Sequence, residues 1–164
     1  PSVATALSDF HRQRLLATCM ATHELFQPFD VDERRALMAK FKSRTFERGS
    51  VLLHEGQPPS GLYIVLHGRL VVTRQVDGQE ATLAELQPGS MFGEMSLLAN
   101  EPTNATVVAT TDCFVLRLSR QNFNEVMMTH PQTLELVAQV SDQRREANQV
   151  LLDMHLTPHA AMLV

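Results

Sequence analysis

Residues 89–107 read GSMFGEMSLLANEPTNATV, a stretch with the features of a site for a small anion. Gly93 permits a close approach of the backbone to a ligand, and the segment from Ser96 to Ala99 suits one short helical turn. The free N–H groups and the positive dipole end of such a turn attract a phosphate or another small anion. The stretch therefore predicts an anion-binding loop, although it contains no lysine or arginine.

Strands are predicted on both sides of this loop. All seven glycines lie between residues 49 and 93, among short apolar runs rich in Val, Ile and Leu. Asp77-Gly78 is a strong signal for a two-residue hairpin turn. The predicted strands cover residues 51–54, 62–66, 70–73, 105–109 and 113–118. Closely spaced strands of this kind form a small antiparallel barrel or roll.

Helices are predicted before and after the strands. Residues 10–20 form a short helical piece, and Asp30 with Glu33 has the form of a capping box. Beyond the strands, Ser119 caps a helix, and a second helix runs from Pro131 without a breaker to about residue 154. The chain therefore places its strands between two helical segments.

The last predicted helix has two possible partners. Its apolar stripe fits the a and d positions of a heptad, with Arg144 as the polar exception. The stripe consists of Val137, Val140, Arg144, Ala147, Leu151 and Met154. Two interpretations fit this pattern equally well. In one, two copies of the helix form a parallel coiled-coil homodimer, and in the other, a single helix packs its stripe on the barrel.

Composition excludes several classes of protein. With 164 residues the chain is long enough for one full domain and too short for two ordinary ones. A net charge of −4, from 14 basic and 18 acidic residues, argues against direct nucleic-acid binding. The two cysteines are far apart, which excludes a disulfide framework and favours a cytoplasmic protein. No apolar run is long enough to insert into a membrane.

Catalytic and metal-binding patterns are missing from the sequence as well. His155 and His159 have the spacing of a two-ligand helical metal site, but Pro158 lies between them and no third ligand is near. His54 and His67 fit polar residues at strand ends better than haem ligands. Because no nucleophile elbow, Cys–His pair or framed carboxylate pair is present, we expect no enzyme, no metal and no cofactor.

The central stretch resembles a known module. The segment 92–98, followed by Pro102 and residues 105–107, resembles the phosphate-binding cassette of the cyclic nucleotide-binding domain. This domain occurs in catabolite-activator-type regulators of bacteria and in the regulatory subunits of cAMP-dependent protein kinase. Glu55-Gly56 and residues 61–68 resemble its strand-turn-strand, and the resemblance extends roughly over residues 24–154.

The resemblance implies a fold and an organisation. The fold is mainly β with flanking α-helices: an antiparallel β-roll, or jelly-roll-like double-stranded β-helix, with N-terminal helices and a long C-terminal helix. The expected parts are a helical lead-in at 1–23, the roll at 24–118 with its cassette at 92–106, helices at 119–155 and a tail at 156–164. Since the chain starts at Pro1 and ends beyond the long helix, we expect a piece of a larger protein that carries an effector domain.

The resemblance also implies a ligand and its contacts. The ligand is cAMP or cGMP, and Glu94 accepts a hydrogen bond from its ribose 2′-hydroxyl. The alternative for Glu94 is a carboxylate that only complements the dipole of the helical turn. The expected ligand-binding residues are Phe92, Gly93, Glu94, Met95, Ser96, Pro102, Thr103, Asn104 and Ala105.

One charge of the family pattern is missing. The residue after the cassette proline is normally an arginine that binds the cyclic phosphate, and here it is Thr103. Its hydroxyl and the N–H of Asn104 donate only neutral hydrogen bonds, so affinity should fall about 10- to 100-fold. Four arginines outside the cassette are possible replacements, although each fits a solvated strand or helix face: Arg69, Arg74, Arg117 and Arg144.

Three functions remain open for such a site. They are a weak or atypical cyclic nucleotide sensor, a sensor of another small molecule in the same pocket, and a ligand-independent interaction module. In the family that the chain resembles, binding of the phosphate draws the cassette inward, and an apolar contact near Leu97 or Leu98 moves with it. The helices from Ser119 onward then move, so signalling would be conformational.

Overall fold

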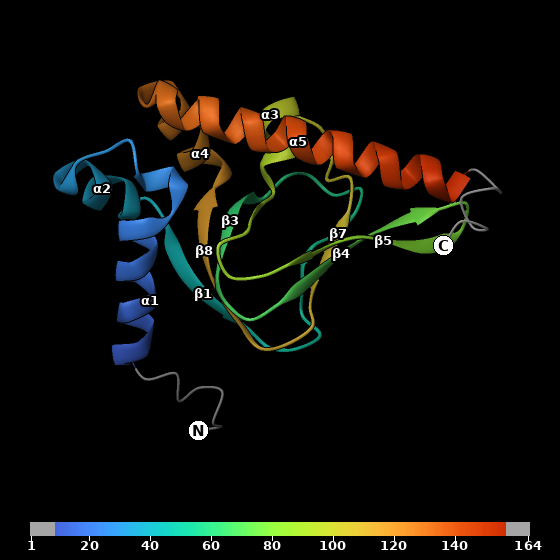
Figure 1. The fold of residues 1–164 in the computed structure, drawn as a ribbon, viewed down its shortest axis with the longest axis horizontal. Coiled ribbons are helices and arrows are strands. Elements are labelled where there is room, and N and C mark those ends of the chain that lie inside the picture. Colours follow the sequence, from blue (N-terminus) through green and yellow to red (C-terminus); the bar gives the residue numbers. More distant parts are fainter. Residues whose placement is uncertain (1–8, 157–164) are drawn as a thin grey trace.

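The computed structural model describes residues 9–156, which form a strand-rich body with helices at one end and a long helix across it (Figure 1). The helices are α1 (Asp9–Thr22), the 3-10 helix η1 (Glu24–Phe26), α2 (Val31–Met38), α3 (Glu94–Ala99), α4 (Arg120–Thr129) and α5 (Pro131–Leu156). The strands are β1 (Lys42–Phe46), β2 (Val51–Leu53), β3 (Gly61–His67), β4 (Leu70–Val76), β5 (Gln79–Leu86), β6 (Met91–Phe92), β7 (Thr106–Ala109) and β8 (Cys113–Ser119).

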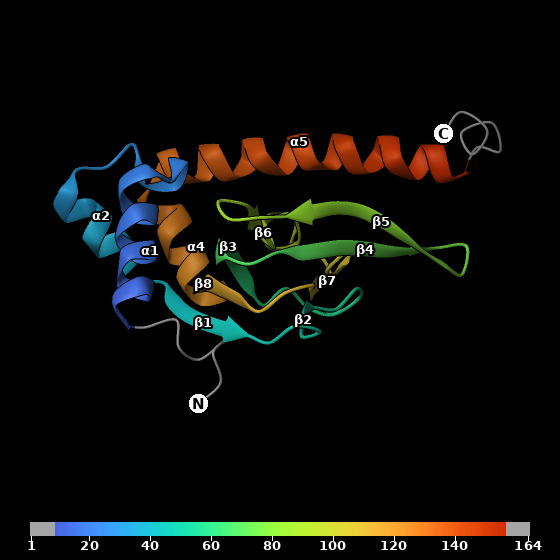
Figure 2. The same cartoon turned by 60° about the horizontal axis from the view of Figure 1, so that its bottom comes forward.

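The strands form two antiparallel sheets, which together make up the roll (Figure 2). The first sheet has the order β1-β8-β3-β6, and the second has the order β2-β7-β4-β5. Helices α1 and α4 lie beside the first sheet, and α5 runs along the side that carries α3 and β5. The predicted fold class, an antiparallel β-roll with flanking helices, is confirmed.

Within the first sheet, β3 is buried on both faces, which explains why residues 61–66 include no charged side chain. Side chains alternate along a strand, so residues 62, 64 and 66 join one core cluster with the helices. Residues 63 and 65 point into the roll and join a second cluster. In β8, Phe114, Leu116 and Leu118 share the helix-side cluster, as their alternation predicted.

Local signals in the sequence form the predicted caps and turns. The Asp30 carboxylate accepts from the Glu33 N–H at 2.8 Å, and the Glu33 carboxylate accepts from the Asp30 N–H at 3.2 Å. Asp77 and Gly78 both have positive φ, of 52° and 78°, as a tight hairpin turn requires. Ser119 caps α4 by accepting from the Asn122 N–H.

The cassette helix begins two residues earlier than predicted. The sequence placed a helical turn at Ser96–Ala99, whereas α3 starts at Glu94. The reason is Gly93, whose left-handed backbone ends β6 and turns the chain directly into the helix. Strands β1, β5 and β6 were not among the predicted strands. The polar composition of β1 and the two-residue length of β6 give little periodic signal, and β5 was indicated only by the hairpin turn that precedes it.

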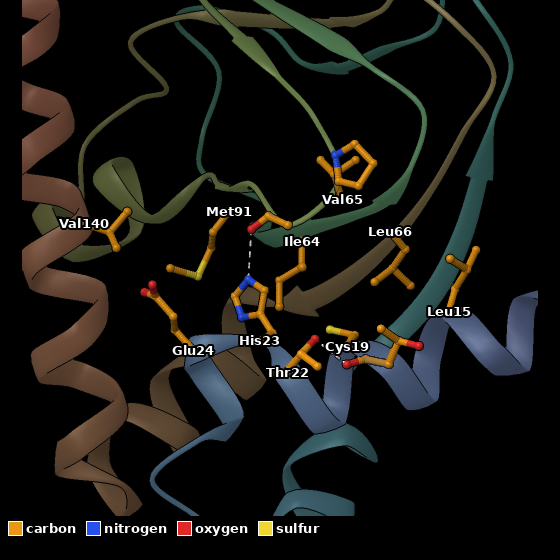
Figure 3. A pocket seen from close by; sticks show the side chains of 13 residues that line it. Leu15, Cys19, Thr22, His23, Glu24, Ile64, Val65, Leu66, Met91 and Val140 are labelled. Atoms are coloured by element: carbon orange, nitrogen blue, oxygen red, sulfur yellow. Dashed lines mark hydrogen bonds between the residues drawn. The ribbon is translucent and has the colours of Figure 1, made fainter.

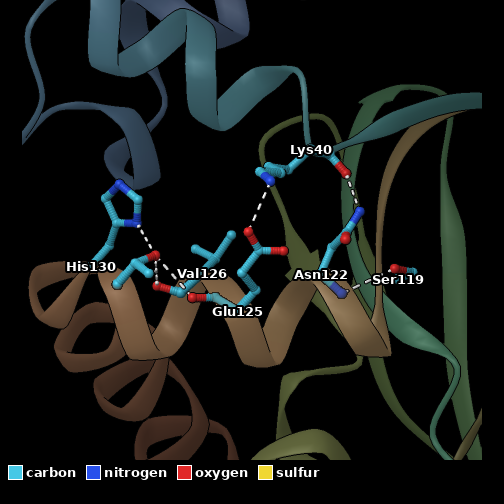
Figure 4. Close-up of polar contacts among 7 residues, drawn as sticks. Lys40, Ser119, Asn122, Glu125, Val126 and His130 are labelled. Atoms are coloured by element: carbon cyan, nitrogen blue, oxygen red, sulfur yellow. Dashed lines mark hydrogen bonds and ion pairs between the residues drawn. The ribbon is translucent and has the colours of Figure 1, made fainter.

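Two contacts hold α4 against the connection between α2 and β1 (Figure 4). The Asn122 side-chain amide donates to the Lys40 carbonyl at 3.2 Å, and the Lys40 ammonium lies 3.0 Å from the Glu125 carboxylate. The ion pair is exposed, with 42% and 53% of its side chains accessible, whereas the amide contact is partly buried. The two contacts should therefore differ in strength.

We expect Asn122→Ala to lower the free energy of unfolding by about 1 kcal/mol, because it leaves a partly buried carbonyl unpaired. Lys40→Met should cost less than about 0.5 kcal/mol, because exposed ion pairs contribute little and this variant retains the Lys40 carbonyl. Urea unfolding of both variants measures the difference. A larger loss for Lys40→Met than for Asn122→Ala would contradict this assignment.

The described part of the chain limits two further possibilities. Across residues 9–156, no helix combines the length and the apolar character needed to cross a membrane. Within the same residues, no group of three or more histidine, cysteine, aspartate or glutamate side chains is placed to hold a metal ion. His159 lies outside the described residues, and the side chain of His155 is not described.

Candidate functional site

The cassette turn between β6 and α3 requires glycine at position 93. Gly93 has a φ of 92°, and a Cβ atom there would lie 2.3 Å from the Gly61 carbonyl oxygen. Any side chain would therefore collide with β3 as well as strain the turn. At the other end, Asn100 adopts a left-handed conformation and its N–H bonds to the Ser96 carbonyl. Both ends of α3 are thus fixed by residues with positive φ.

A cavity of about 40 Å³ lies between this turn, the roll and α5. Its lining includes seven predicted site residues: Phe92, Gly93, Met95, Ser96, Thr103, Asn104 and Ala105. Leu53, Val72 and Val107 of the roll and Arg144 and Asn148 of α5 complete it. Pro102 is exposed and does not line the cavity. Glu94 is fully buried beside it and contacts Arg144.

Arg144 pairs with Glu94 inside the site. One guanidinium nitrogen, Nη1, donates to both carboxylate oxygens, at 2.7 and 2.9 Å. The other, Nη2, donates to the Met91 carbonyl. The Glu94 side chain is 0% exposed and the Arg144 side chain 25% exposed, so the pair is largely withdrawn from water. α5 is therefore joined to the cassette by a charged contact.

The electrostatics of this pair are dominated by burial. Removal from water raises the pKa of Glu94 above its ordinary value, and the positive charge of Arg144 opposes that rise. Among the described residues that line the cavity, Arg144 carries the one charged side chain, and its charge is matched by Glu94. The site thus has no net charge and offers no unpaired cation to a phosphate group.

Thr103 is held in place by its backbone. Its N–H donates to the Gln57 carbonyl and its carbonyl accepts from the Gly56 N–H, both at 2.7 Å. The side chain is buried and lines the cavity. Position 103 is therefore fixed next to the turn between β2 and β3, with a neutral group facing the site.

The arginines outside the cassette have different places. Arg69 pairs with Glu85 on the surface, Arg117 donates to the Ser60 carbonyl, and Arg74 does not line the cavity. The interpretation as a solvated face is wrong for Arg144, because α5 folds back over α3 and carries this residue inward. Asn148, one helical turn further on, was also missed.

The first half of the stripe predicted on the last helix packs against other parts of the same chain. Val137 is fully buried, Val140 packs against the core, and Arg144 contacts Glu94. Ala147 is exposed, and the side chains of Leu151 and Met154 are not described. These contacts favour packing on the roll, and the homodimer stays a prediction.

The sequence signal for the site was the polar series Ser141, Arg144 and Asn148, whose i, i+3, i+7 spacing marks one helix face.

Comparisons with known proteins agree with this geometry. The family model of the cyclic nucleotide-binding domain matches residues 43–130. The cyclic AMP receptor protein of Thermus thermophilus is 32% identical over 126 residues, which cover 76% of this chain and 58% of that protein. The chain thus spans little more than half of this relative.

Two solved structures of kinase regulatory subunits are similar in fold. One, from a cAMP-independent protein kinase A of Trypanosoma cruzi, is bound to guanosine and has a TM-score of 0.71 at 26% identity. It covers 87% of this chain, which spans 52% of it. The other, from Trypanosoma brucei, has a TM-score of 0.71 at 28% identity and covers 85% of this chain, which spans 52% of it. It is a triple mutant with one threonine changed to arginine, bound to cAMP.

Proposed function

The chain belongs to the cyclic nucleotide-binding domain family, and on that premise we propose that it is the ligand-sensing part of a larger regulatory protein. Its cassette binds a ribose-bearing ligand, holds cAMP and cGMP only weakly, and passes occupancy through α5 to an attached effector. The observation that carries this proposal is the contact of Arg144 with Glu94. The carboxylate that would bind a ribose hydroxyl is occupied by a cation from the helix that would carry the signal.

Ligand entry and the position of α5 exclude each other. A cavity of about 40 Å³ holds a few water molecules at most, whereas ligand pockets usually measure roughly 300–1,000 Å³. A hydroxyl that bonds to Glu94 competes with Arg144 for the carboxylate, and a ribose needs the space beside Asn148. The ligand therefore has differential affinity for two positions of α5, which is the requirement for a conformational signal.

The charge balance favours an uncharged ligand over a cyclic phosphate. A phosphate would enter a site whose single lining cation already neutralises Glu94, and Thr103 supplies no second positive charge. A nucleoside brings the ribose hydroxyls without this cost. The guanosine complex of the Trypanosoma cruzi relative supports a nucleoside as the favoured ligand. The relatives reported above are regulatory proteins, so we propose binding without catalysis.

A ligand titration tests this function. We expect guanosine or adenosine to raise the melting temperature of the domain, because a ligand at a hundredfold excess over Kd adds about 2.7 kcal/mol to the free energy of unfolding. cAMP and cGMP should require at least about tenfold higher concentrations. Calorimetric titration supplies Kd and stoichiometry for each of the four ligands.

The control variants separate the site from the surface around it. Glu94→Gln should abolish binding, because an amide cannot replace the carboxylate as a strong acceptor. Glu101→Gln changes an exposed residue of the cassette that does not line the cavity, and it should bind as the native chain does. If none of the four ligands binds the folded domain, the sensor is rejected in favour of a ligand-independent interaction module.

A further inference from the structure

A second and much larger cavity lies under α1, outside the cassette (Figure 3). It measures about 560 Å³, is partly open to solvent, and is lined by residues of α1, η1, β3, the turn before β6, β6 and α5. Its buried floor is formed by Cys19, Ile64, Leu66 and Met91, and Leu15 and Val140 flank it. The volume falls within the range of small-molecule sites, which are mostly apolar with a few polar groups.

This cavity is separate from the cassette. Met91 and Phe92 are neighbours on β6, so their side chains point to opposite faces of the sheet. Met91 belongs to the core cluster on the helix side and lines the large cavity. Phe92 belongs to the cluster inside the roll and lines the cassette cavity. A ligand under α1 therefore occupies a different site from the one proposed above, and the argument for it does not depend on that function.

Two polar side chains that line the large cavity, those of Thr22 and His23, already have hydrogen-bond partners. His23 Nδ1 accepts from the Leu25 N–H at 3.1 Å, and His23 Nε2 lies 3.0 Å from the Gly89 carbonyl. Since Nε2 must donate to that carbonyl, both ring nitrogens are engaged in the neutral form. The Thr22 hydroxyl donates to the Thr18 carbonyl at 2.7 Å. Burial raises the pKa of the Cys19 thiol to about 12, so it stays uncharged. The interior of this cavity thus favours contact with the apolar surface of a ligand.

Charge at the rim restricts the occupant further. Glu24 is exposed, and among the described residues that line the cavity it is the one acidic side chain, with no lysine or arginine beside it. A negatively charged ligand would be repelled by this carboxylate, with no cation to offset the repulsion. Fatty acids and nucleotides are therefore poor candidates. We propose that this cavity is a binding site for an apolar small molecule that carries no negative charge.

A pair of related dyes tests the site. N-phenylnaphthylamine is apolar and neutral, and anilinonaphthalene sulfonate adds one negative charge to the same ring system. We expect the neutral dye to bind the whole chain with one-to-one stoichiometry, shown by a saturable rise in its fluorescence. The sulfonate should bind at least about tenfold more weakly than the neutral dye. Glu24→Gln removes the negative charge at the rim and should reduce this difference in affinity between the two dyes.

Two tryptophan variants locate the bound dye. Leu15→Trp places a bulky indole ring in the cavity and should weaken binding of the neutral dye at least about tenfold. Ala17→Trp is the matched control, because this exposed residue lies on the same helix and does not line the cavity. Thermal unfolding shows whether both variants are folded, so that loss of binding is not loss of structure.

The outcomes decide the proposal. Saturable one-to-one binding that Leu15→Trp weakens and Ala17→Trp leaves unchanged supports it. Fluorescence that rises without saturation, or equally in both folded variants, overturns the site. Should Leu15→Trp fail to fold, Val140→Phe fills the opposite wall and applies the same criterion. Tighter binding of the sulfonate than of the neutral dye would overturn the assigned ligand class.

Discussion

Replacement of Arg144 by methionine should lower the free energy of unfolding by about 3 kcal/mol at neutral pH. Methionine is unbranched and resembles the aliphatic part of arginine but carries no charge, so the fully buried Glu94 carboxylate loses its ionic partner. Denaturant unfolding measures the loss. The matched control is Arg145→Met, which removes the same charge from an exposed position of α5 and should cost less than about 0.5 kcal/mol.

The loss in Arg144→Met should also depend on pH. The pKa of Glu94 is raised by burial in the native chain, and Arg144 opposes the rise, so the variant should raise it further. Between the unfolded value near 4.5 and the raised folded value, the folded state holds an extra proton. The stabilisation from this proton is fully present below the unfolded pKa and is lost as the pH rises through the folded pKa. Acidification from pH 7 towards pH 5 should therefore restore part of the lost stability.

A double variant checks the cause of this pH dependence. Glu94→Gln combined with Arg144→Met contains neither charge, so its stability should not vary with pH through this group, and it should be more stable than Arg144→Met at pH 7. If Arg144→Met is as stable as Arg145→Met, or if its stability falls on acidification, the buried pair does not have the energetic role described above.

The substitution Thr103→Arg should strengthen cAMP binding about 10- to 100-fold, because charge-assisted hydrogen bonds contribute roughly 1.5–3 kcal/mol each. Position 103 already faces the cavity, and an arginine there adds a positive charge that Glu94 does not neutralise. The site would then carry a net charge of the sign that a cyclic phosphate requires. Calorimetric titration of cAMP into both proteins measures the gain.

Thr103→Gln is the matched control for this gain. Glutamine is long and donates hydrogen bonds but carries no charge, so it should leave cAMP affinity within about threefold of the native value. Guanosine, which has no phosphate, should not bind Thr103→Arg more tightly than the native chain. An equal gain for arginine and glutamine would show that side-chain length, and not charge, limits binding.

Features set by neighbouring residues could be predicted from the sequence. The capping box at Asp30, the hairpin at Asp77-Gly78 and the Ser119 cap each depend on three or four adjacent residues. The cassette is equally local, so Gly93 and Glu94 could be identified with the turn that contains them. The fold class followed because these local signals occur in a consistent order along the chain.

Features set by distant contacts could not be predicted in this way. Arg144 lies 50 positions after Glu94, and the periodicity of α5 shows which residues share a face but not what that face covers. The cavity under α1 is a similar case, because it depends on how α1 packs on β3, and Cys19 is the one buried residue of that helix. Both features require the positions of elements that the sequence pattern leaves open.

The most direct test of this account is the distance between α5 and the roll with and without ligand. Spin labels on cysteines that replace the exposed residues Thr82 and Glu146 report this distance by pulsed electron paramagnetic resonance. The native Cys19 and Cys113 are buried, and burial raises the pKa of both thiols, so they should react little with the label. Saturating guanosine should produce a second, longer distance, and Arg144→Met should populate the same distance without ligand. An unchanged distance in protein that calorimetry shows to be saturated would contradict the claim that the ligand displaces α5.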